Sequence, residues 1–253
     1  MAEPPRGVGL DSLPGLFVTG TDTGVGKTRV AAAIARSMVE GGRRVGVLKP
    51  VATGATRVGD SWNCEDAEAL IEAIGGGVGS EQVCPIRFEE PLAPPVAARR
   101  LGIPLDLGAV LDATRAALDW WAGRADVAVV EGVGGLLCPI AEGATVADLA
   151  VALDFPLVIV ARRGLGTLNH TLLTVEAALL RGLRIAGVVL NGDRPTADPI
   201  AEATNADELA RRLDGVAVLA DVPHSADLSG LWDSLRGIDW YGRAAPTRAT
   251  RRP

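Results

Sequence analysis

Residues 20–28, with the sequence GTDTGVGKT, restrict what this chain can fold into more than any other stretch. They follow an apolar run at 16–18 and precede residues 29–40, where apolar side chains recur at helical spacing. A strand, a glycine-rich loop and a helix in this order place successive backbone N–H groups around the phosphates of a nucleotide. The segment therefore predicts a phosphate-binding loop.

The residues of this loop have distinct expected roles. Lys27 is expected to reach the β- and γ-phosphates, and Thr28 to offer its hydroxyl to Mg²⁺. The spacing is a variant of the pattern GxxxxGK[ST], because Thr21 holds the place of the first glycine and Gly20 lies one residue earlier. The residues expected to contact the nucleotide here are Thr23, Gly24, Val25, Gly26, Lys27 and Thr28.

Strand-like apolar runs alternate with helical patterns along the rest of the chain. This alternation predicts an α/β fold, in which a mostly parallel sheet is covered by helices on both faces. With the loop, it indicates a single domain of the P-loop NTPase type. Further strands are expected at 44–48, 127–130, 155–161, 184–191 and 216–222, and further helices at 65–77, 105–123, 164–182 and 196–213.

Several polar residues come at or just after the ends of these strands. Lys49, Glu131, Asn191 and Pro223 have this position, and parallel α/β sheets bind ligands at the carboxyl ends of their strands. Asp66 lies in the first turn of the expected helix 65–77. Glu131, an acid at a strand end followed by glycines, is similar to the metal-side acid of phosphate-loop enzymes. We therefore expect one ligand-binding edge.

The domain is expected to span residues 16–225. Residues 1–15 are rich in proline and glycine and lack the apolar core of a signal peptide, so we expect a disordered leader. The proline-rich stretch 81–104 is expected to be an irregular excursion over the ligand edge. Residues 226–253 are expected to form a partly disordered extension, and its arginine-containing end is expected to be a disordered tail.

Composition excludes some classes of protein. A net charge of −6 argues against a nucleic-acid-binding scaffold. The three cysteines, Cys64, Cys84 and Cys138, are too few and too scattered for a disulfide framework or a zinc site. No apolar run approaches the roughly 20 residues that cross a bilayer. We therefore expect a cytoplasmic protein with no nucleic-acid or membrane partner.

Taken together, the motifs resemble those of the dethiobiotin synthetase family, enzymes of biotin biosynthesis. GTDTGVGKT, KPVATG, the helix start at Asp66, EGVGGLL, GLGTLNHT and VVLNG occur in the family's order over residues 16–225. The resemblance implies an ATP- and Mg²⁺-dependent cyclo-ligase. Such an enzyme converts 7,8-diaminopelargonic acid and CO₂ to dethiobiotin through carbamate and carbamic-phosphate intermediates.

The resemblance also implies roles for individual residues. Thr28, Asp66 and Glu131 would bind the metal, while Lys27, Lys49 and Thr23 would act in catalysis. The substrate diamine and its carbamate would meet Thr23, Lys49 and Thr53, and its distal carboxylate would meet residues contributed across a homodimer interface. The nucleotide would also contact Glu131, Asn191 and Pro223. The residues implied for the carboxylate are Gly166, Thr167, Leu168 and Asn169.

Some positions depart from the family pattern. Gly24 stands where many relatives carry an acidic residue, and Ala220 and His224 replace the Gly and Trp that some relatives show beside the base. Base preference therefore stays open. Asn169 has an alternative interpretation as a helix N-cap.

Two other functions also stay open. One is a related amide-forming synthetase, such as a cobyrinate diamide synthetase, although that family usually carries an additional amidotransferase domain. The other is a ParA/MinD-like nucleotide switch. Such switches usually have an extra lysine early in the loop, where this chain has Thr21, Asp22 and Thr23.

Overall fold

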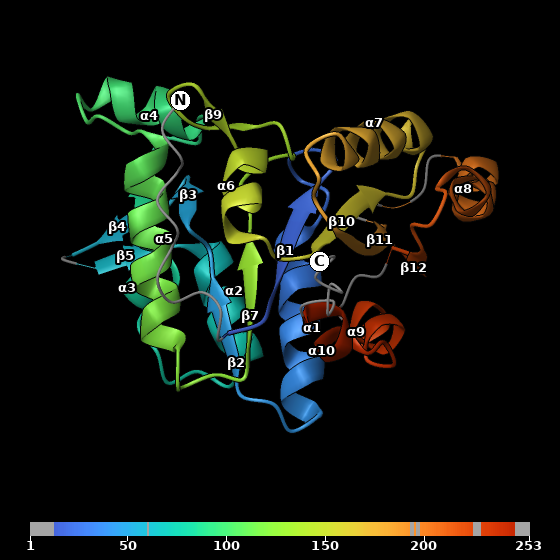
Figure 1. Cartoon of the computed structure of the whole chain (residues 1–253), viewed down its shortest axis with the longest axis horizontal. Coiled ribbons are helices and arrows are strands. Elements are labelled where there is room, and N and C mark those ends of the chain that lie inside the picture. The colour runs from blue at the N-terminus through green and yellow to red at the C-terminus, as the bar shows by residue number, and fades with distance from the viewer. Residues whose placement is uncertain (1–12, 60, 193–194, 196–197, 225–228, 246–253) are drawn as a thin grey trace, which may run out of the picture.

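The computed structural model describes residues 13–59, 61–192, 195, 198–224 and 229–245. Its centre is a parallel sheet of six strands in the order β12-β11-β10-β1-β7-β2 (Figure 1). All six expected strands are confirmed. They are β1 Gly15–Gly20, β2 Val45–Leu48, β7 Val127–Glu131, β10 Leu157–Arg162, β11 Ile185–Asn191 and β12 Val218–Val222.

The central strands are continuous apolar runs because the sheet is covered on both faces. Every residue of β1 and β7 is buried, and β10 is buried up to its last residue, Arg162. Alternation of apolar and polar residues would be expected only if one face met water. The order of the strands brings the ends of β1, β7 and β2 side by side, which positions the residues that follow them.

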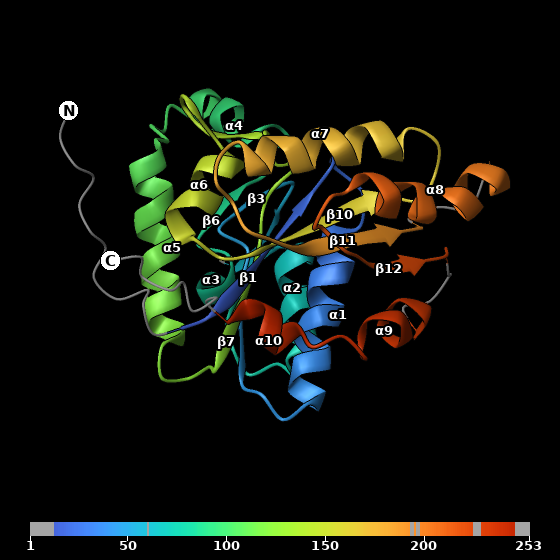
Figure 2. The same cartoon turned by 45° about the vertical axis from the view of Figure 1, so that its right-hand side comes forward.

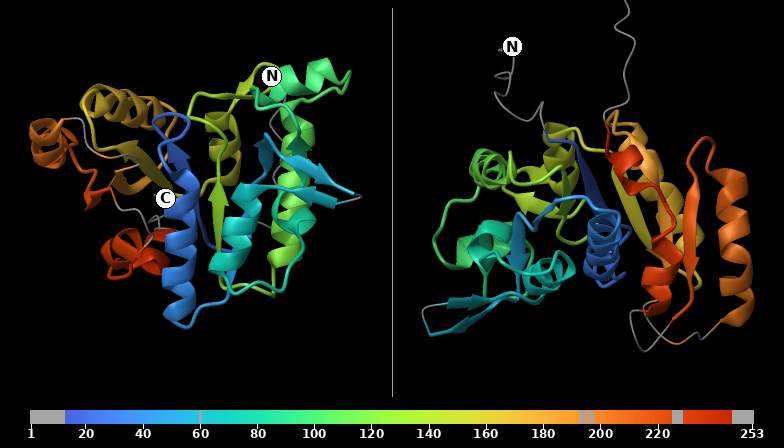
Figure 3. Two further views of the ribbon diagram at one scale, coloured as in Figure 1. Left: turned by 180° about the vertical axis from the view of Figure 1, so that it is seen from behind. Right: turned by 90° about the horizontal axis from the view of Figure 1, so that it is seen from below.

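Helices form a layer on each side of the sheet (Figures 2 and 3). On one side α1 packs against β1, β2 and β7, with α2 and two C-terminal helices beside it. On the other side α5 and α6 lie together, and α7 packs on β10 and α8. Their bounds are α1 Lys27–Glu40, α2 Glu65–Ala73, α5 Leu107–Trp121, α6 Val146–Leu153, α7 Thr167–Leu179 and α8 Pro199–Arg212.

One of these helices, α6, was not expected from the sequence. It is short and apolar, so its pattern does not distinguish it from a buried strand. Its start carries a capping box. The Thr145 side chain accepts a hydrogen bond from the Asp148 N–H, and the Asp148 carboxylate accepts one from the Thr145 N–H. That pair was the available sequence signal.

The proline-rich stretch also contains regular structure, so the expectation of an irregular excursion at 81–104 was wrong. Proline starts helices well, and Pro94 and Pro95 open α4.

Short strands elsewhere pair locally, including the hairpin of β4 and β5. The remaining elements are α3 Ser80–Val83, α4 Pro94–Arg100, β3 Val51–Thr53, β4 Thr56–Val58, β5 Ser61–Asn63, β6 Ile86–Phe88, β8 Pro139–Ala141 and β9 Ala144–Thr145.

The expected domain boundaries require correction at both ends. Gly15 already belongs to β1, and the preceding Leu13 is buried. After residue 225, α9 (Ser229–Leu235) and α10 (Trp240–Ala244) pack against α1, so this part of the expected extension belongs to the core. The physical reason is apolar burial, since Leu235 and Trp240 are at most 1% exposed. Residues 1–12 and 246–253 lie outside the described residues.

No helix in the described part of the chain is both long enough and apolar enough to span a membrane.

Candidate active site

The phosphate-binding loop is held open between β1 and α1 by its glycines. Gly24 and Gly26 have φ angles of 71° and 89°, a region that favours glycine. A Cβ at Gly26 would lie 2.1 Å from the Asn191 side-chain nitrogen. That nitrogen donates a 2.9 Å hydrogen bond to the Val25 carbonyl. Asn191, at the end of β11, therefore holds the loop from below.

Lys27 begins α1 and lies along the inside of the loop. Its side chain is only 6% exposed, and Nζ donates a 3.0 Å hydrogen bond to the Asp22 carbonyl oxygen. Burial and the nearby Lys49 lower the pKa of Lys27 to about 8, although Glu131 acts in the opposite direction. The ammonium group is thus poorly compensated, and an anionic phosphate would supply the missing negative charge.

Lys49 follows β2 and is almost fully enclosed, at 3% exposure. Its Nζ lies 2.7 Å from Glu131 Oε1 and 2.8 Å from Asp66 Oδ2. Burial opposes the charged form, but the attraction of the two carboxylates outweighs it and raises the pKa of Lys49. The same attraction outweighs the burial of Asp66 and lowers the pKa of that carboxyl. Lys49 is therefore a buried positive charge held between two carboxylates.

The side chains of Thr28, Asp66 and Glu131 offer oxygen ligands for a hard cation. The Thr28 hydroxyl lies 2.7 Å from Asp66 Oδ1 and 2.8 Å from Glu131 Oε1, yet it has one hydrogen to donate. Glu131 Oε2 is buried with no hydrogen-bond partner among the described residues. Mg²⁺ usually takes one or two carboxylates together with phosphate oxygens. The three side chains fit this donor set.

Within the described residues, no group of three or more His, Cys, Asp or Glu side chains could hold a metal by itself.

Most of the predicted site residues line one cavity of about 530 Å³. Val25 does not line this cavity, because its side chain is fully buried in the core, so only its backbone could contact a nucleotide. Arg29, Val133 and Gly134 also line the cavity and were not predicted. The predicted residues that line it are Thr23, Gly24, Gly26, Lys27, Thr28, Lys49, Thr53, Asp66 and Glu131.

The sequence analysis also did not predict an ion pair beside the loop, between Arg162 and Asp22. Arg162, the last residue of β10, lies 3.0 Å from Asp22 Oδ2 and donates a 2.8 Å hydrogen bond to the Thr23 carbonyl. Its hydrogen bond lowers the pKa of Asp22. A Cβ at Gly24 would lie 3.9 Å from the same guanidinium, which contacts the Asp22 carboxylate. The available signal was a charged residue directly after the apolar run 155–161.

Residues 166–169 lie at the start of α7 and do not line the cavity of their own chain. Gly166 is the N-cap, with φ 91°, and Asn169 is exposed at the third helical position, so the interpretation of Asn169 as the cap was wrong. The Thr167 N–H also donates to the Gly164 carbonyl, at 3.3 Å. The N–H groups of Gly166, Leu168 and Asn169 have no partner among the described residues.

The nucleotide's expected base side is formed by the ends of β11 and β12. Pro223 is exposed just beyond β12. The adjacent His224 places Nδ1 3.2 Å from the Gly192 carbonyl oxygen, and the Gly192 N–H bonds the Val222 carbonyl. Asn191 is 2% exposed and does not line the cavity. Its side-chain nitrogen bonds the Val25 carbonyl of the loop instead. A direct base contact by Asn191 or Pro223 stays a prediction.

Comparison with known proteins gives consistent matches over most of the chain. A family model described as an AAA domain matches residues 14–231. The chain is 50% identical over 197 residues to the ATP-dependent dethiobiotin synthetase BioD of Anaeromyxobacter dehalogenans strain 2CP-C, covering 78% of this chain and 84% of that protein. It is 46% identical over 224 residues to the BioD of strain 2CP-1, covering 88% and 96%. With BioD of Anaeromyxobacter sp. strain Fw109-5 the identity is 44% over 215 residues, covering 85% and 92%.

Proposed function

The chain belongs to the ATP-dependent dethiobiotin synthetase family, and from this we propose how its site carries out ATP-dependent dethiobiotin synthesis. The observation that carries the proposal is the convergence of Lys27, Thr28, Lys49, Asp66 and Glu131 on one cavity. The phosphate loop explains the use of ATP. The buried charges beyond it suit a reaction in which two anions must approach each other.

The triphosphate of ATP binds in the loop through backbone N–H groups and the Lys27 ammonium. Thr28, Asp66 and Glu131 would hold Mg²⁺, which when bound would supply neutralisation of negative charge on the transferring phosphoryl group. This assignment is supported by the unpartnered Glu131 Oε2 and by the Thr28 hydroxyl, which faces two carboxylate oxygens.

The substrate steps need positioning and positive charge more than a protein nucleophile. One amine of 7,8-diaminopelargonic acid adds to CO₂ and loses a proton, which gives a carbamate. A carbamate oxygen attacks the γ-phosphorus and ADP leaves; the second amine then attacks the activated carbonyl and phosphate leaves. Lys49 stays protonated beside the carbamate, while Thr53 and Thr23 line the wall where the diamine would lie.

The distal carboxylate of the diamine binds at the start of α7, contributed by the neighbouring subunit of a homodimer. Support comes from the unpartnered N–H groups of Gly166, Leu168 and Asn169 at a helix N-terminus. These residues do not line the cavity of their own chain, which agrees with a site shared between chains. Two leucines, Leu137 at 49% and Leu173 at 56% exposure, border a second cavity that also contains Thr23, and a partner would cover them.

We also infer a cytoplasmic location. Cys64, Cys84 and Cys138 are all free thiols, and a reducing compartment keeps cysteines in that state.

The direct test is incubation with 7,8-diaminopelargonic acid, bicarbonate and Mg-ATP, followed by detection of dethiobiotin by mass spectrometry. The shared site is tested by mixing Lys27→Met with Asn169→Leu, after showing that each is inactive and folded and that subunits exchange. A mixed dimer contains one site with both residues intact, so part of the activity should return. Exchange without any recovery would contradict the shared site.

A further inference from the structure

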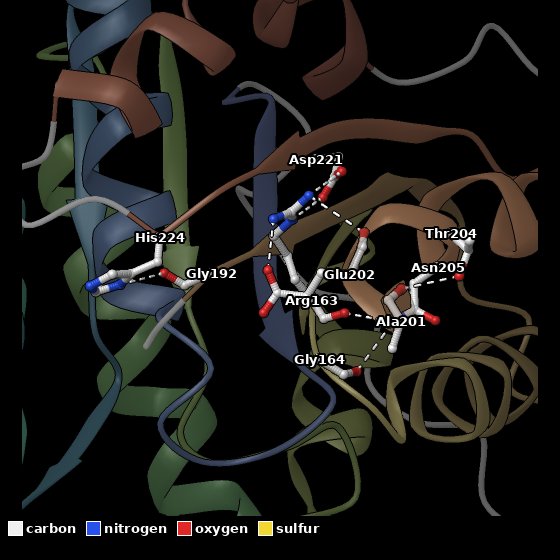
Figure 4. Close-up of polar contacts among 9 residues, drawn as sticks. All are labelled: Arg163, Gly164, Gly192, Ala201, Glu202, Thr204, Asn205, Asp221 and His224. Atoms are coloured by element: carbon white, nitrogen blue, oxygen red, sulfur yellow. Dashed lines mark hydrogen bonds and ion pairs between the residues drawn. The ribbon is translucent and has the colours of Figure 1, made fainter. Parts of the chain in front are cut away.

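A polar network next to the start of α7 has no part in the assignments above. Its centre is Arg163, which directly follows Arg162 and points away from the phosphate loop toward α8 and β12 (Figure 4). The Arg163 side chain is only 13% exposed. Such a buried cation needs partners that fully compensate its charge.

Two carboxylates from different elements supply that compensation. Arg163 binds both oxygens of Asp221 on β12, at 2.5 and 2.8 Å, in the paired geometry that a guanidinium favours. Its Nη1 also donates to Glu202 Oε2 on α8, at 2.9 Å. The guanidinium therefore ties α8 to the edge strand of the sheet.

Asn205 connects this network to the turn that opens α7. It lies three residues after Glu202, on the same face of α8, and it is 5% exposed. Its side-chain nitrogen donates to the Arg163 carbonyl at 2.6 Å and to the Gly164 carbonyl at 3.3 Å. The Gly164 carbonyl also accepts the Thr167 N–H. The Asn205 amide thus fixes the Gly164 carbonyl, which lies in the turn that precedes α7.

We infer that Asn205, held in place by Arg163 with its two carboxylates, is a positioning residue for recognition of the substrate's distal carboxylate. It acts by fixing the turn at residues 164–166, and so the direction of the free N–H groups at the start of α7. The inference rests on the proposed docking of the carboxylate at that helix. It concerns KM for the diamine and not the phosphate chemistry, because Asn205 lies outside the catalytic cavity.

The test replaces Asn205 with leucine, which has a similar shape and donates no hydrogen bond. Loss of the two bonds should raise KM for 7,8-diaminopelargonic acid about 5- to 20-fold, with kcat and KM for ATP within about twofold. If Asn205→Leu does not fold, Asn205→Ala removes the same donors without added volume. The control is Thr204→Ala, since within the described part of the chain the Thr204 hydroxyl bonds only carbonyls of α8 itself. It should leave all three constants unchanged.

A carboxylate-free substrate separates positioning from general damage. In 2,3-diaminononane a methyl group replaces the carboxylate and the vicinal diamine is kept. With this analogue the parent and Asn205→Leu should have the same kcat/KM, because there is no carboxylate to misplace. A loss of equal size with both substrates, or an unchanged KM for the natural diamine, would overturn the inference.

The docking site itself needs a separate variant. Leu168→Pro removes one N–H from the first turn of α7, where proline is tolerated. If Leu168→Pro raises KM for the diamine and Asn205→Leu does not, the positioning role is wrong and the docking site stands. If neither variant affects KM, the carboxylate binds elsewhere and both proposals fail.

Discussion

Replacing Lys27 with methionine should abolish the reaction and yet stabilise the protein without ligand. The Lys27 ammonium is 6% exposed, and its pKa falls from 10.5 to about 8, chiefly because of burial and then because of Lys49. At 1.36 kcal/mol for each pKa unit, that fall corresponds to about 3 kcal/mol against the charged form. Loss of the bond to the Asp22 carbonyl offsets about 1 kcal/mol. A net gain of about 2 kcal/mol would raise Tm by about 4–8 °C.

The gain has a definite dependence on pH. Below pH 8 Lys27 is protonated in both the folded and the unfolded chain, so the parent bears the whole cost of burying the charge. Between about pH 8 and 10.5 the folded protein has lost the proton and the unfolded chain retains it, so the parent becomes more stable relative to the variant. The advantage of Lys27→Met should therefore be constant up to pH 8 and then shrink.

The assay is urea unfolding of the ligand-free proteins from pH 6.5 to 10, followed by circular dichroism. The chain has only two lysines, Lys27 and Lys49, so NMR of lysine-labelled protein can follow the titration of each directly. Lys49→Met is the matched comparison. It should cost about 3–5 kcal/mol, because it leaves Asp66 and Glu131 without their buried partner. Equal stability of Lys27→Met and the parent at every pH would refute the reasoning.

Three further outcomes follow from other contacts. Glu131→Gln keeps the shape of the side chain but removes a charged oxygen ligand, so the Mg²⁺ concentration for half-maximal activity should rise about tenfold or more, and an unchanged titration would reduce Glu131 to a structural role. Arg162→Met removes the contacts to Asp22 and the Thr23 carbonyl. Steady-state kinetics should show KM for ATP raised about 3- to 10-fold, and thermal unfolding should show a smaller change in Tm than that of Lys27→Met. Trp240→Ala should lower the free energy of unfolding by about 3–5 kcal/mol, because Trp240 is 1% exposed; a loss under about 1 kcal/mol would mean that α10 contributes little to the core.

The sequence alone determined the fold class and the centre of the site. Continuous apolar runs such as 127–130 identify buried parallel strands, and the glycine loop before a helix identifies the phosphate site. Both are local signals: the pattern lies within a few residues and does not depend on distant partners. Lys49 and Glu131 were predicted for a related reason, because the ends of parallel strands must meet at one edge of the sheet. Asp66, in the first turn of α2, was assigned to the metal only through the family resemblance.

Elements stabilised mainly by distant contacts were harder to find. The helices α9 and α10 lie in a stretch whose arginines and prolines are typical of a tail, and they are ordered by apolar contacts with α1, about 200 residues away in the chain. Short helices gain most of their stability from such packing, which no local pattern reports.

Only the tertiary structure decided how the polar groups pair. The sequence could not reveal that Asn191 bonds the Val25 carbonyl, that Arg162 contacts Asp22, or that Asn205 fixes the turn before α7. Each pair joins residues far apart in the chain, and its geometry depends on which strands are neighbours and on where each helix crosses the sheet. Buried polar groups must find partners, but the fold chooses which ones.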